Sequence, residues 1–412
     1  MNAPAHLLQA EPYVRAAAAP AAAATLRGRA ADIAIAVHGE LPPVEAAWRA
    51  FQDAADCTAF QSFEWLSAWQ RHVGAPAGVA PQIVVARDQG GVLAMLPLAV
   101  VRRGLLRELT WLGSDLCDYN APLLAPDFAR RLDAAAFAAL WRRVLEAIAA
   151  RAPFDIVRLE KMPAAVGVQA NPMTALAVTL NPSGCYATAL GADFQSFYEA
   201  KRSSATRARD RSKRKRLAAC GDIAFVTAAD AASANAVLDV LMTQKAAAFA
   251  KRGIGNIFAR PGYAEFYRAL AAAAPARDLV HVSALKVGQE TAAANFALTF
   301  KGRYYYVLSS YTDGDMARFG PGAAHLHELF RYAIERGCTV FDFTIGDEPY
   351  KRDWCERADP LYDHVAVTTW RGALAAARLT ARAAIKRAIK QNPLLWAAFS
   401  RARAAAGLLR RA

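Results

Sequence analysis

Hydrophobic positions follow the same order in two separate stretches of the chain. Alternation at every second residue predicts strands, and spacing of three to four residues predicts helices. The first stretch predicts three strands at 83–88, 92–101 and 108–113, a loop at 118–123, a helix at 138–150 and a last strand at 154–160. The second predicts the same series at 280–287, 291–300, 304–310, 317–322, 324–337 and 339–346. The offset is 198 residues between Val84 and Val282 and 199 between Pro122 and Pro321, which indicates two related modules.

Strands joined by short turns and followed by a helix and another strand are typical of an α+β module. Further helices are expected ahead of the strands, at 62–73, 237–253 and 263–273. We therefore divide the chain into four segments: a disordered Ala/Pro-rich start, an N-terminal module, a C-terminal module and a basic amphipathic tail, at 1–30, 31–187, 188–370 and 371–412.

Positive charge is concentrated in two segments. The chain has 50 Lys and Arg against 36 Asp and Glu, a net charge of +14. Residues 201–216 hold nine basic residues and one acid, a net charge of +8, and 371–412 hold ten basic residues and no acid, a net charge of +10. The rest of the chain therefore has a net charge of −4. Such segments are typical of contacts with nucleic acid, a phosphate-rich ligand or anionic lipid, and a solvated helix face is the open alternative.

The tail also has features of a helix that lies on an anionic membrane surface. Its basic residues recur on one helix face at Arg378, Arg382, Lys386 and Lys390. A docked or frayed terminal helix is the alternative.

Targeting and membrane signals are weak. Met162 to Ala192 is uncharged, but Pro163, Pro172 and Pro182 interrupt it, so we expect a strand at 174–180 between two turns and no transmembrane helix. The cysteines are sparse and form no C-x-x-C motif, which indicates reduced thiols in a cytoplasmic protein; they are Cys57, Cys117, Cys185, Cys220, Cys338 and Cys355.

The densest chemical signal lies in residues 304–354. Gly320 and Gly322 flank Pro321 between a predicted strand and helix, where free backbone amides can hold a phosphate. A plain tight turn is the alternative. Asp342 lies between two phenylalanines on a predicted buried strand. It is either a catalytic carboxylate or a structural one that accepts hydrogen bonds from a neighbouring loop or pairs with Lys351 or Arg352. The loop after that strand mixes acids, bases and aromatic residues.

Other candidates are weaker. Tyr311 is a possible proton donor among tyrosines that mostly pack. His325 and His327 are two residues apart on a helix and face different ways, so no shared metal is expected. Walker, zinc, Rossmann and nucleophile-elbow motifs are absent from the sequence.

These residues resemble the GNAT-like acetyltransferases of the cellulose-biosynthesis (CelD-like) branch, which is related to the Fem-type peptidoglycan aminoacyltransferases. The resemblance covers about residues 35–370. The segments that carry it are Phe341–Lys351, which is fairly specific, and the looser matches at Arg318–Leu326, Ala333–Gly337, Trp354, Phe63–Trp69, Cys117–Pro122, the basic helix near Lys201, Lys245 and Phe249–Gly253.

The resemblance implies two tandem GNAT-type folds, with mostly antiparallel mixed sheets flanked by helices. It also implies transfer of an acyl group, usually acetyl from acetyl-CoA, to an amine or hydroxyl. A saccharide or cell-envelope precursor is the acceptor expected from the family. The GNAT pyrophosphate loop begins with Arg or Gln, and this chain has Ala317 there, with Arg318 displaced by one residue. Fem-type relatives use aminoacyl-tRNA, and the basic helix would suit a tRNA backbone.

We assign expected roles on this basis. The donor would contact Arg318, Gly320, Gly322 and Ala323, and its carbonyl a strand amide near Leu308 to Tyr311. Asp342 is the first candidate base and Glu348 the second, with Tyr311 returning a proton. The acceptor would contact Tyr350, Lys351 and Trp354, and the N-terminal module would shape its cleft. A binding protein without chemistry, acting through the basic segments or by contact with a membrane, is the rival from another class.

Overall fold

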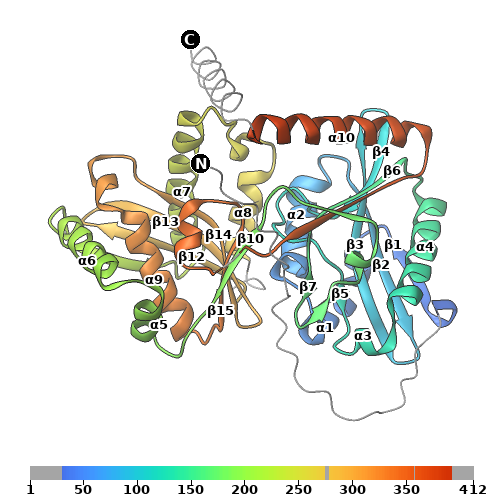
Figure 1. Ribbon diagram of the computed structural model, residues 1–412, viewed down its shortest axis with the longest axis horizontal. Helices are drawn as coiled ribbons and strands as arrows, with labels where there is room; N and C mark the ends of the chain where they lie inside the picture. The colour runs from blue at the N-terminus through green and yellow to red at the C-terminus, as the bar shows by residue number, and fades with distance from the viewer. Residues whose placement is uncertain (1–29, 274–277, 357, 392–412) are drawn as a thin grey trace, which may run out of the picture.

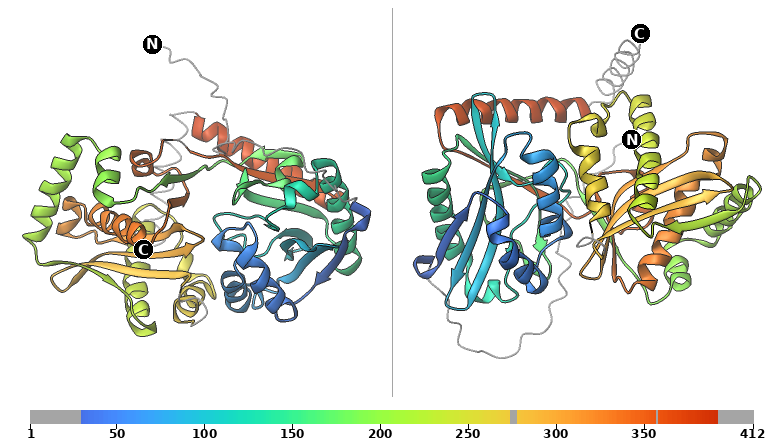
Figure 2. Two further views of the ribbon diagram at one scale, coloured as in Figure 1. Left: turned by 90° about the horizontal axis from the view of Figure 1, so that it is seen from below. Right: turned by 180° about the vertical axis from the view of Figure 1, so that it is seen from behind.

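Two twisted sheets lie side by side in the computed structural model, each flanked by helices (Figures 1 and 2). The structure describes residues 30–273, 278–356 and 358–391. The predicted disordered start therefore lies almost wholly outside the described residues. The same is true of the tail beyond residue 391.

The N-terminal sheet has eight strands within the described residues. In spatial order they are β1 (Ala34–His38), β2 (Ala80–Asp88), β3 (Gly91–Arg103), β4 (Leu106–Trp111), β6 (Ile156–Pro163), β16 (Leu361–Val367) and β9 (Val178–Leu180), and β5 (Leu123–Leu124) pairs with β3. All pairs are antiparallel except β4 with β6. A small hairpin of β7 (Ala165–Val166) and β8 (Gln169–Ala170) lies apart from it.

Helices bury the two faces of this sheet. They are α1 (Glu45–Ala54), α2 (Phe63–Trp69), α3 (Phe128–Arg131) and α4 (Ala134–Arg151), and α2 continues into a π-helical turn at Gln70–Gly74. The long apolar run of β3 is buried on both sides over 93–100, as expected for a strand between two helical layers.

The C-terminal sheet has six strands within the described residues. Their order is β10 (Cys185–Ala189), β15 (Val340–Ile345), β14 (Arg303–Tyr311), β13 (Glu290–Phe300), β12 (Val280–Val287) and β11 (Ile223–Thr227). Its helices are α5 (Phe194–Lys201), α6 (Ser204–Ala218), α7 (Ala231–Lys251), α8 (Tyr263–Ala272) and α9 (Pro321–Glu335). β14 and β15 are parallel, as β4 and β6 are in the first sheet. This shared order confirms the predicted α+β modules.

Two expectations differ from the structure. The segment 361–367, which we placed in the C-terminal module, forms β16 in the interior of the N-terminal sheet, where it pairs with β6 and β9. The strand expected at 174–180 is confined to β9, because Asn171 caps a 3-10 turn at Pro172–Ala175. Asn and Pro favour such a turn over an extended chain.

The modules share one hydrophobic core. Trp65 of α2 packs edge-on against Phe266 of α8, with ring centroids 4.8 Å apart, and Phe60 meets Tyr305 at 5.7 Å. After β16, α10 (Trp370–Gln391) runs across the N-terminal module (Figure 1). Of the basic stripe expected there, the structure describes the Arg378 side chain but not those of Arg382, Lys386 and Lys390.

Among the described helices we find none with the length and apolar character needed to cross a bilayer.

Candidate active site

The parallel strands β14 and β15 separate shortly after they begin. Arg303, Tyr304 and Tyr305 pair with Val340, Phe341 and Asp342, and no further pairs join these strands in the described chain. On its other edge, β14 has a bulge against β13, because its register shifts between the pairs of Tyr305 and Leu308. A bulge bends its strand away from the regular ladder. The backbone amides of β14 that face β15 beyond the bulge are therefore available to a ligand.

A glycine-flanked helix start follows β14 after a short connection. Gly320 adopts a left-handed φ of 68° after the 3-10 turn Asp315–Phe319, and Pro321 opens α9. In the described chain no side chain caps α9, so the amides of Gly322 and Ala323 keep the unsatisfied donors of a helix start. A Cβ at Gly322 would lie 3.1 Å from the ring of Tyr311, so a larger residue would crowd the end of β14.

Charged side chains face the point where the strands separate. Lys245 of α7 donates to the carbonyl oxygen of Ser309 at 3.1 Å. Lys351 is buried and reaches both the carbonyl oxygen of Ile345 and the carboxylate of Glu348, each at 2.9 Å. A Cβ at Gly346 would lie 2.6 Å from Glu348 Oε2, so the turn brings this carboxylate against its own backbone.

This environment shifts the proton affinities of the cluster. Burial lowers the pKa of Lys245 to about 8, an effect that Glu348 opposes. Burial alone would raise the pKa of Glu348, but the charge of Lys351 and its hydrogen bond lower it below its usual value. Glu348 is therefore ionised at neutral pH, and Lys245 holds its proton less tightly than an ordinary lysine does.

Asp118 is a site residue for which the sequence analysis proposed no role. It lies in the loop that precedes β5, and burial raises the pKa of its carboxyl, against the opposing effects of Lys161 and of a hydrogen bond with Thr344. Thr344 has a φ of 59°, which is strained for a β-branched residue. The only sequence signal for Asp118 was the resemblance of its loop, Cys117–Pro122, to the family. The packing of the two modules is what brings Asp118 to β15.

Asp342 has a structural position. It is 1% exposed. One oxygen accepts hydrogen bonds from the Tyr119 hydroxyl at 2.7 Å and the Thr344 amide at 2.8 Å, and the other pairs with Arg303 at 2.8 Å. Both oxygens are thus occupied inside the junction of the modules. The geometry favours the structural alternative over a catalytic base. Tyr119 donates the hydrogen bond from a neighbouring loop, and the ion-pair partner is Arg303 instead of Lys351 or Arg352.

The remaining predicted residues divide into exposed and buried groups. Tyr311 is 54% and Tyr350 39% exposed, and both border the separation of the strands. Trp354 is only 4% exposed, stacked near Phe197 and under the guanidinium of Arg202. Trp354 therefore belongs to the core, and this corrects its expected contact with a substrate.

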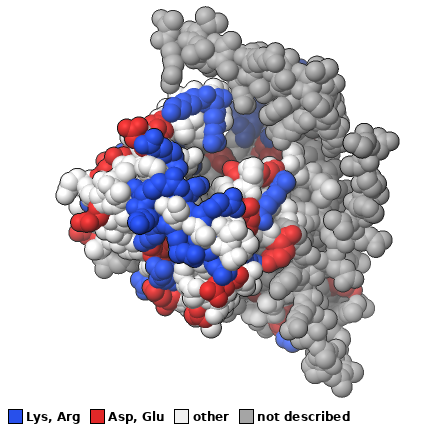
Figure 3. Space-filling model, turned by 60° about the vertical axis from the view of Figure 1, so that its left-hand side comes forward, with Lys and Arg blue, Asp and Glu red and all other residues white. Residues whose placement is uncertain are grey.

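The basic segment forms α6, which packs beside the start of α9. Lysine and arginine side chains gather in one area of this face of the molecule (Figure 3). The side chain of Lys213 comes within 3.8 Å of the position that a Cβ on Gly320 would take. Arg318, displaced from the expected loop position, is exposed and lies 4.9 Å from the ring centre of Phe319.

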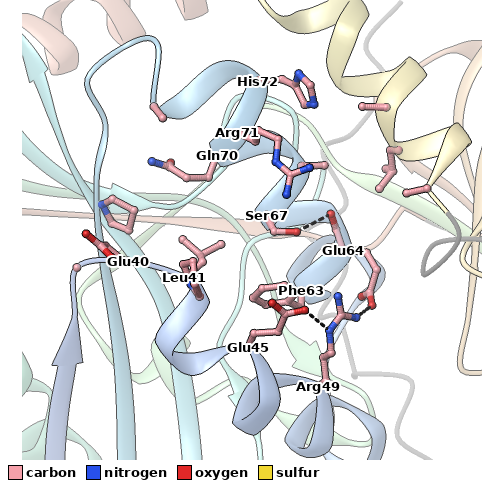
Figure 4. A pocket seen from close by; sticks show the side chains of 18 residues that line it. Glu40, Leu41, Glu45, Arg49, Phe63, Glu64, Ser67, Gln70, Arg71 and His72 are labelled. Atoms are coloured by element: carbon pink, nitrogen blue, oxygen red, sulfur yellow. Dashed lines mark hydrogen bonds and ion pairs between the residues drawn. The ribbon is translucent and has the colours of Figure 1, made fainter.

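A cavity of about 570 Å³ lies on the N-terminal module where α8 of the other module meets it. Arg49 bridges the carboxylates of Glu45 and Glu64 there (Figure 4). Arg71 and His72, from the π-helical turn, also line it. Its volume is in the range of small-molecule sites.

Comparison with known proteins finds a domain match within the C-terminal module. Residues 204–352 match the acetyltransferase (GNAT) domain. The fold is similar to the crystal structure of FemX, with a TM-score of 0.53, 12% identity and coverage of 78% of this chain and 96% of that one. It is also similar to a conserved protein of unknown function from Bacteroides thetaiotaomicron, with a TM-score of 0.52, 12% identity and coverage of 81% and 100%. No curated protein sequence matches the chain.

At these identities the two structures show the fold alone. Together with the domain match, they confirm the expected fold class, in which mixed, mostly antiparallel sheets are flanked by helices in GNAT-like modules.

Proposed function

We propose that this protein transfers an acyl group from an acyl-CoA to an amine or hydroxyl of a saccharide or cell-envelope precursor. One observation carries the proposal: β14 separates from β15 and leads, through a short connection, to a helix start that the side chain of its N-cap residue does not cap. Both features lie in the segment that matches an acetyltransferase domain. An extended donor would have its carbonyl between the strands and its pyrophosphate at the helix start.

On this proposal the backbone binds the donor. The amides of Gly322 and Ala323 donate to the pyrophosphate, Gly320 lets the chain turn there, and Arg318 adds a positive charge. An amide of β14 between Leu308 and Tyr311 donates to the thioester oxygen and stabilises the charge that develops on it.

Proton transfer would involve the charged cluster. The lone pair of the acceptor nitrogen or oxygen forms a bond to the thioester carbon, and Glu348 accepts the proton of that amine or hydroxyl. The carbon–sulfur bond then breaks, and Tyr311 gives a proton to the departing thiolate. Lys351 orients Glu348 through their ion pair, and Tyr350 contributes an acceptor surface.

The cavity on the N-terminal module is assigned to a distal part of an extended acceptor, because none of its lining residues belongs to the cluster around Glu348. Carboxylates, guanidinium groups and Gln70 line it beside apolar residues, and such polar groups suit a hydroxyl-rich molecule. This gives the N-terminal module the role of shaping the acceptor site.

Release of free CoA from acetyl-CoA tests the proposal. The wild-type protein is expected to release CoA slowly without acceptor, and Glu348→Gln to reduce the rate at least about tenfold, since the general base is lost. Glu335→Gln, at the exposed end of α9, is the control and should leave the rate unchanged. Unaltered turnover in Glu348→Gln would remove this residue from the mechanism. If the protein neither binds any acyl-CoA nor releases CoA from it, acyl-CoA is not the donor.

Aminoacyl transfer from tRNA is the second candidate, and the exposed cations of α6 support it. In that case the protein should protect an aminoacyl-tRNA from hydrolysis in a salt-sensitive way, and acetyl-CoA should not compete.

A further inference from the structure

Helix α6 has a composition that its packing does not require. Seven of its residues are Lys or Arg, at Arg207, Arg209, Arg211, Lys213, Arg214, Lys215 and Arg216, and Leu217 alone is buried. Among the described residues, the one ion pair from these cations joins Arg214 to Glu328 of α9 at 2.8 Å. Like charges four residues apart, such as Arg211 and Lys215, destabilise a helix. The charge therefore costs stability that a ligand of opposite sign would recover.

Three cationic residues from two elements lie near the start of α9. Leu217 packs in one apolar cluster with Met316 and Phe319 of the turn before α9. This packing places Lys213 beside Gly320. The guanidinium groups of Arg216 and Arg318 lie 6.0 and 4.9 Å from the same Phe319 ring.

We propose that Lys213, Arg216 and Arg318 bind the 3′-phosphate at the nucleotide end of the donor. This inference rests on the proposed function, because it takes the pyrophosphate to lie at Gly322 and Ala323. An acyl-CoA is a linear molecule whose 3′-phosphoadenosine lies beyond the pyrophosphate, away from the acyl group. With the acyl group between β14 and β15, the other end extends from the α9 start, where these three cations stand.

The clustering favours one compact phosphate site over a nucleic-acid track. Lys213 and Arg216 lie on the side of α6 that packs toward α9, near Leu217. Lys215 follows Lys213 by two residues and so projects from the opposite side of the helix. A phosphate bound at the start of α9 would meet Lys213 and Arg216 but not Lys215, whereas a nucleic acid lying along α6 would meet all three.

Binding of acetyl-CoA and of 3′-dephospho-acetyl-CoA, measured by calorimetry, tests this difference. The wild type is expected to bind acetyl-CoA about tenfold more tightly. Lys213→Gln and Arg216→Gln should reduce this ratio to about threefold or less. Lys215→Gln removes the same charge from the same helix and should keep the wild-type ratio. Because the ratio compares two ligands on one protein, partial misfolding affects both measurements and leaves it unchanged.

The possible results separate the two proposals. If the wild type binds and hydrolyses acetyl-CoA but does not distinguish the dephospho form, the phosphate site is wrong and the proposed function stands. The same holds if all three variants change the ratio equally. If aminoacyl-tRNA binds and all three variants weaken its binding alike, α6 binds a nucleic acid and the phosphate site is wrong. The proposed function then stands only if acetyl-CoA is still bound and hydrolysed. Absence of acetyl-CoA binding by the wild type overturns both proposals.

Discussion

Single residues at the module junction have roles that depend on which atoms they meet. Asp342 and Glu348 are both carboxylates of the segment that resembles the acetyltransferase family. Asp342 is enclosed with every oxygen occupied, while Glu348 is exposed beside Lys351 and ionised. A base must reach its substrate, so geometry ranks Glu348 above Asp342.

The two roles predict different results for Asp342→Asn. We expect a loss of about 2 kcal/mol in the free energy of unfolding, because Arg303 loses a charged hydrogen-bond partner at a buried site. Turnover per folded molecule should stay within about threefold of the wild type, because no substrate contact is removed. Urea denaturation and CoA release measure the two quantities.

Asp347→Asn, at an exposed position close by, is the control and should change neither quantity. A normal stability with abolished turnover in Asp342→Asn would return Asp342 to the role of base.

At the scale of elements, α9 is held to its sheet by polar groups buried without charge. His281 of β12 contacts the Tyr304 hydroxyl at 2.8 Å and stacks on Tyr332 of α9, with ring centroids 3.9 Å apart. His325 of α9 contacts Ser283 of β12 at 3.2 Å. Burial lowers the pKa of each histidine to about 3. The packing of α9, and with it the proposed donor site, therefore requires neutral imidazoles.

This requirement predicts a loss of stability in acid. Below the ordinary histidine pKa of about 6.5, these histidines bind protons in the unfolded chain but not in the folded chain. The stability that they contribute is therefore fully present above pH 6.5 and is lost as the pH decreases toward 3. Each histidine should contribute about 1.4 kcal/mol per pH unit in that window.

Urea denaturation of His325→Asn at pH 7 and pH 5.5 is the measurement. Between these pH values the variant should lose less free energy of unfolding than the wild type. Its free energy of unfolding at pH 7 should be lower than that of the wild type, because its packing is altered. The control His38→Asn lies on the edge strand β1 and should keep the wild-type pH dependence. An equal acid loss in both variants would mean that His325 does not titrate as its burial implies.

At the scale of the whole molecule, the chain crosses between the modules twice. It leaves the N-terminal sheet after β9 and returns after β15 to insert β16 between β6 and β9. With the shared aromatic core, this strand makes the stability of the N-terminal sheet depend on a segment that follows the proposed donor site in sequence.

A proline in β16 tests this dependence. Val365→Pro should destabilise the N-terminal module by about 3 kcal/mol or more, because proline fixes φ and has no amide hydrogen to give to a sheet in which Val365 is paired with Arg158. The side chain of Val365 is 41% exposed, so Val365→Thr should change stability by less than about 0.5 kcal/mol. Hydrogen exchange of the β2–β4 amides is the readout. Protection lost only in the C-terminal sheet would contradict the role of β16.

The sequence determined the features that depend on neighbouring residues. Periodicity located the central strands β2–β4, β6 and β12–β15 and the helices α4 and α9, but not β1, β10, β11 or β16. Gly320 with Pro321 marked the start of α9. These features are predictable because φ preferences and side-chain spacing act within a few residues. The tertiary structure alone decided which distant groups meet. Tyr119 reaches Asp342 across 223 residues, Asp118 reaches Thr344, and β16 joins the first sheet. Such contacts come from packing and from satisfying buried polar groups, which no local pattern records.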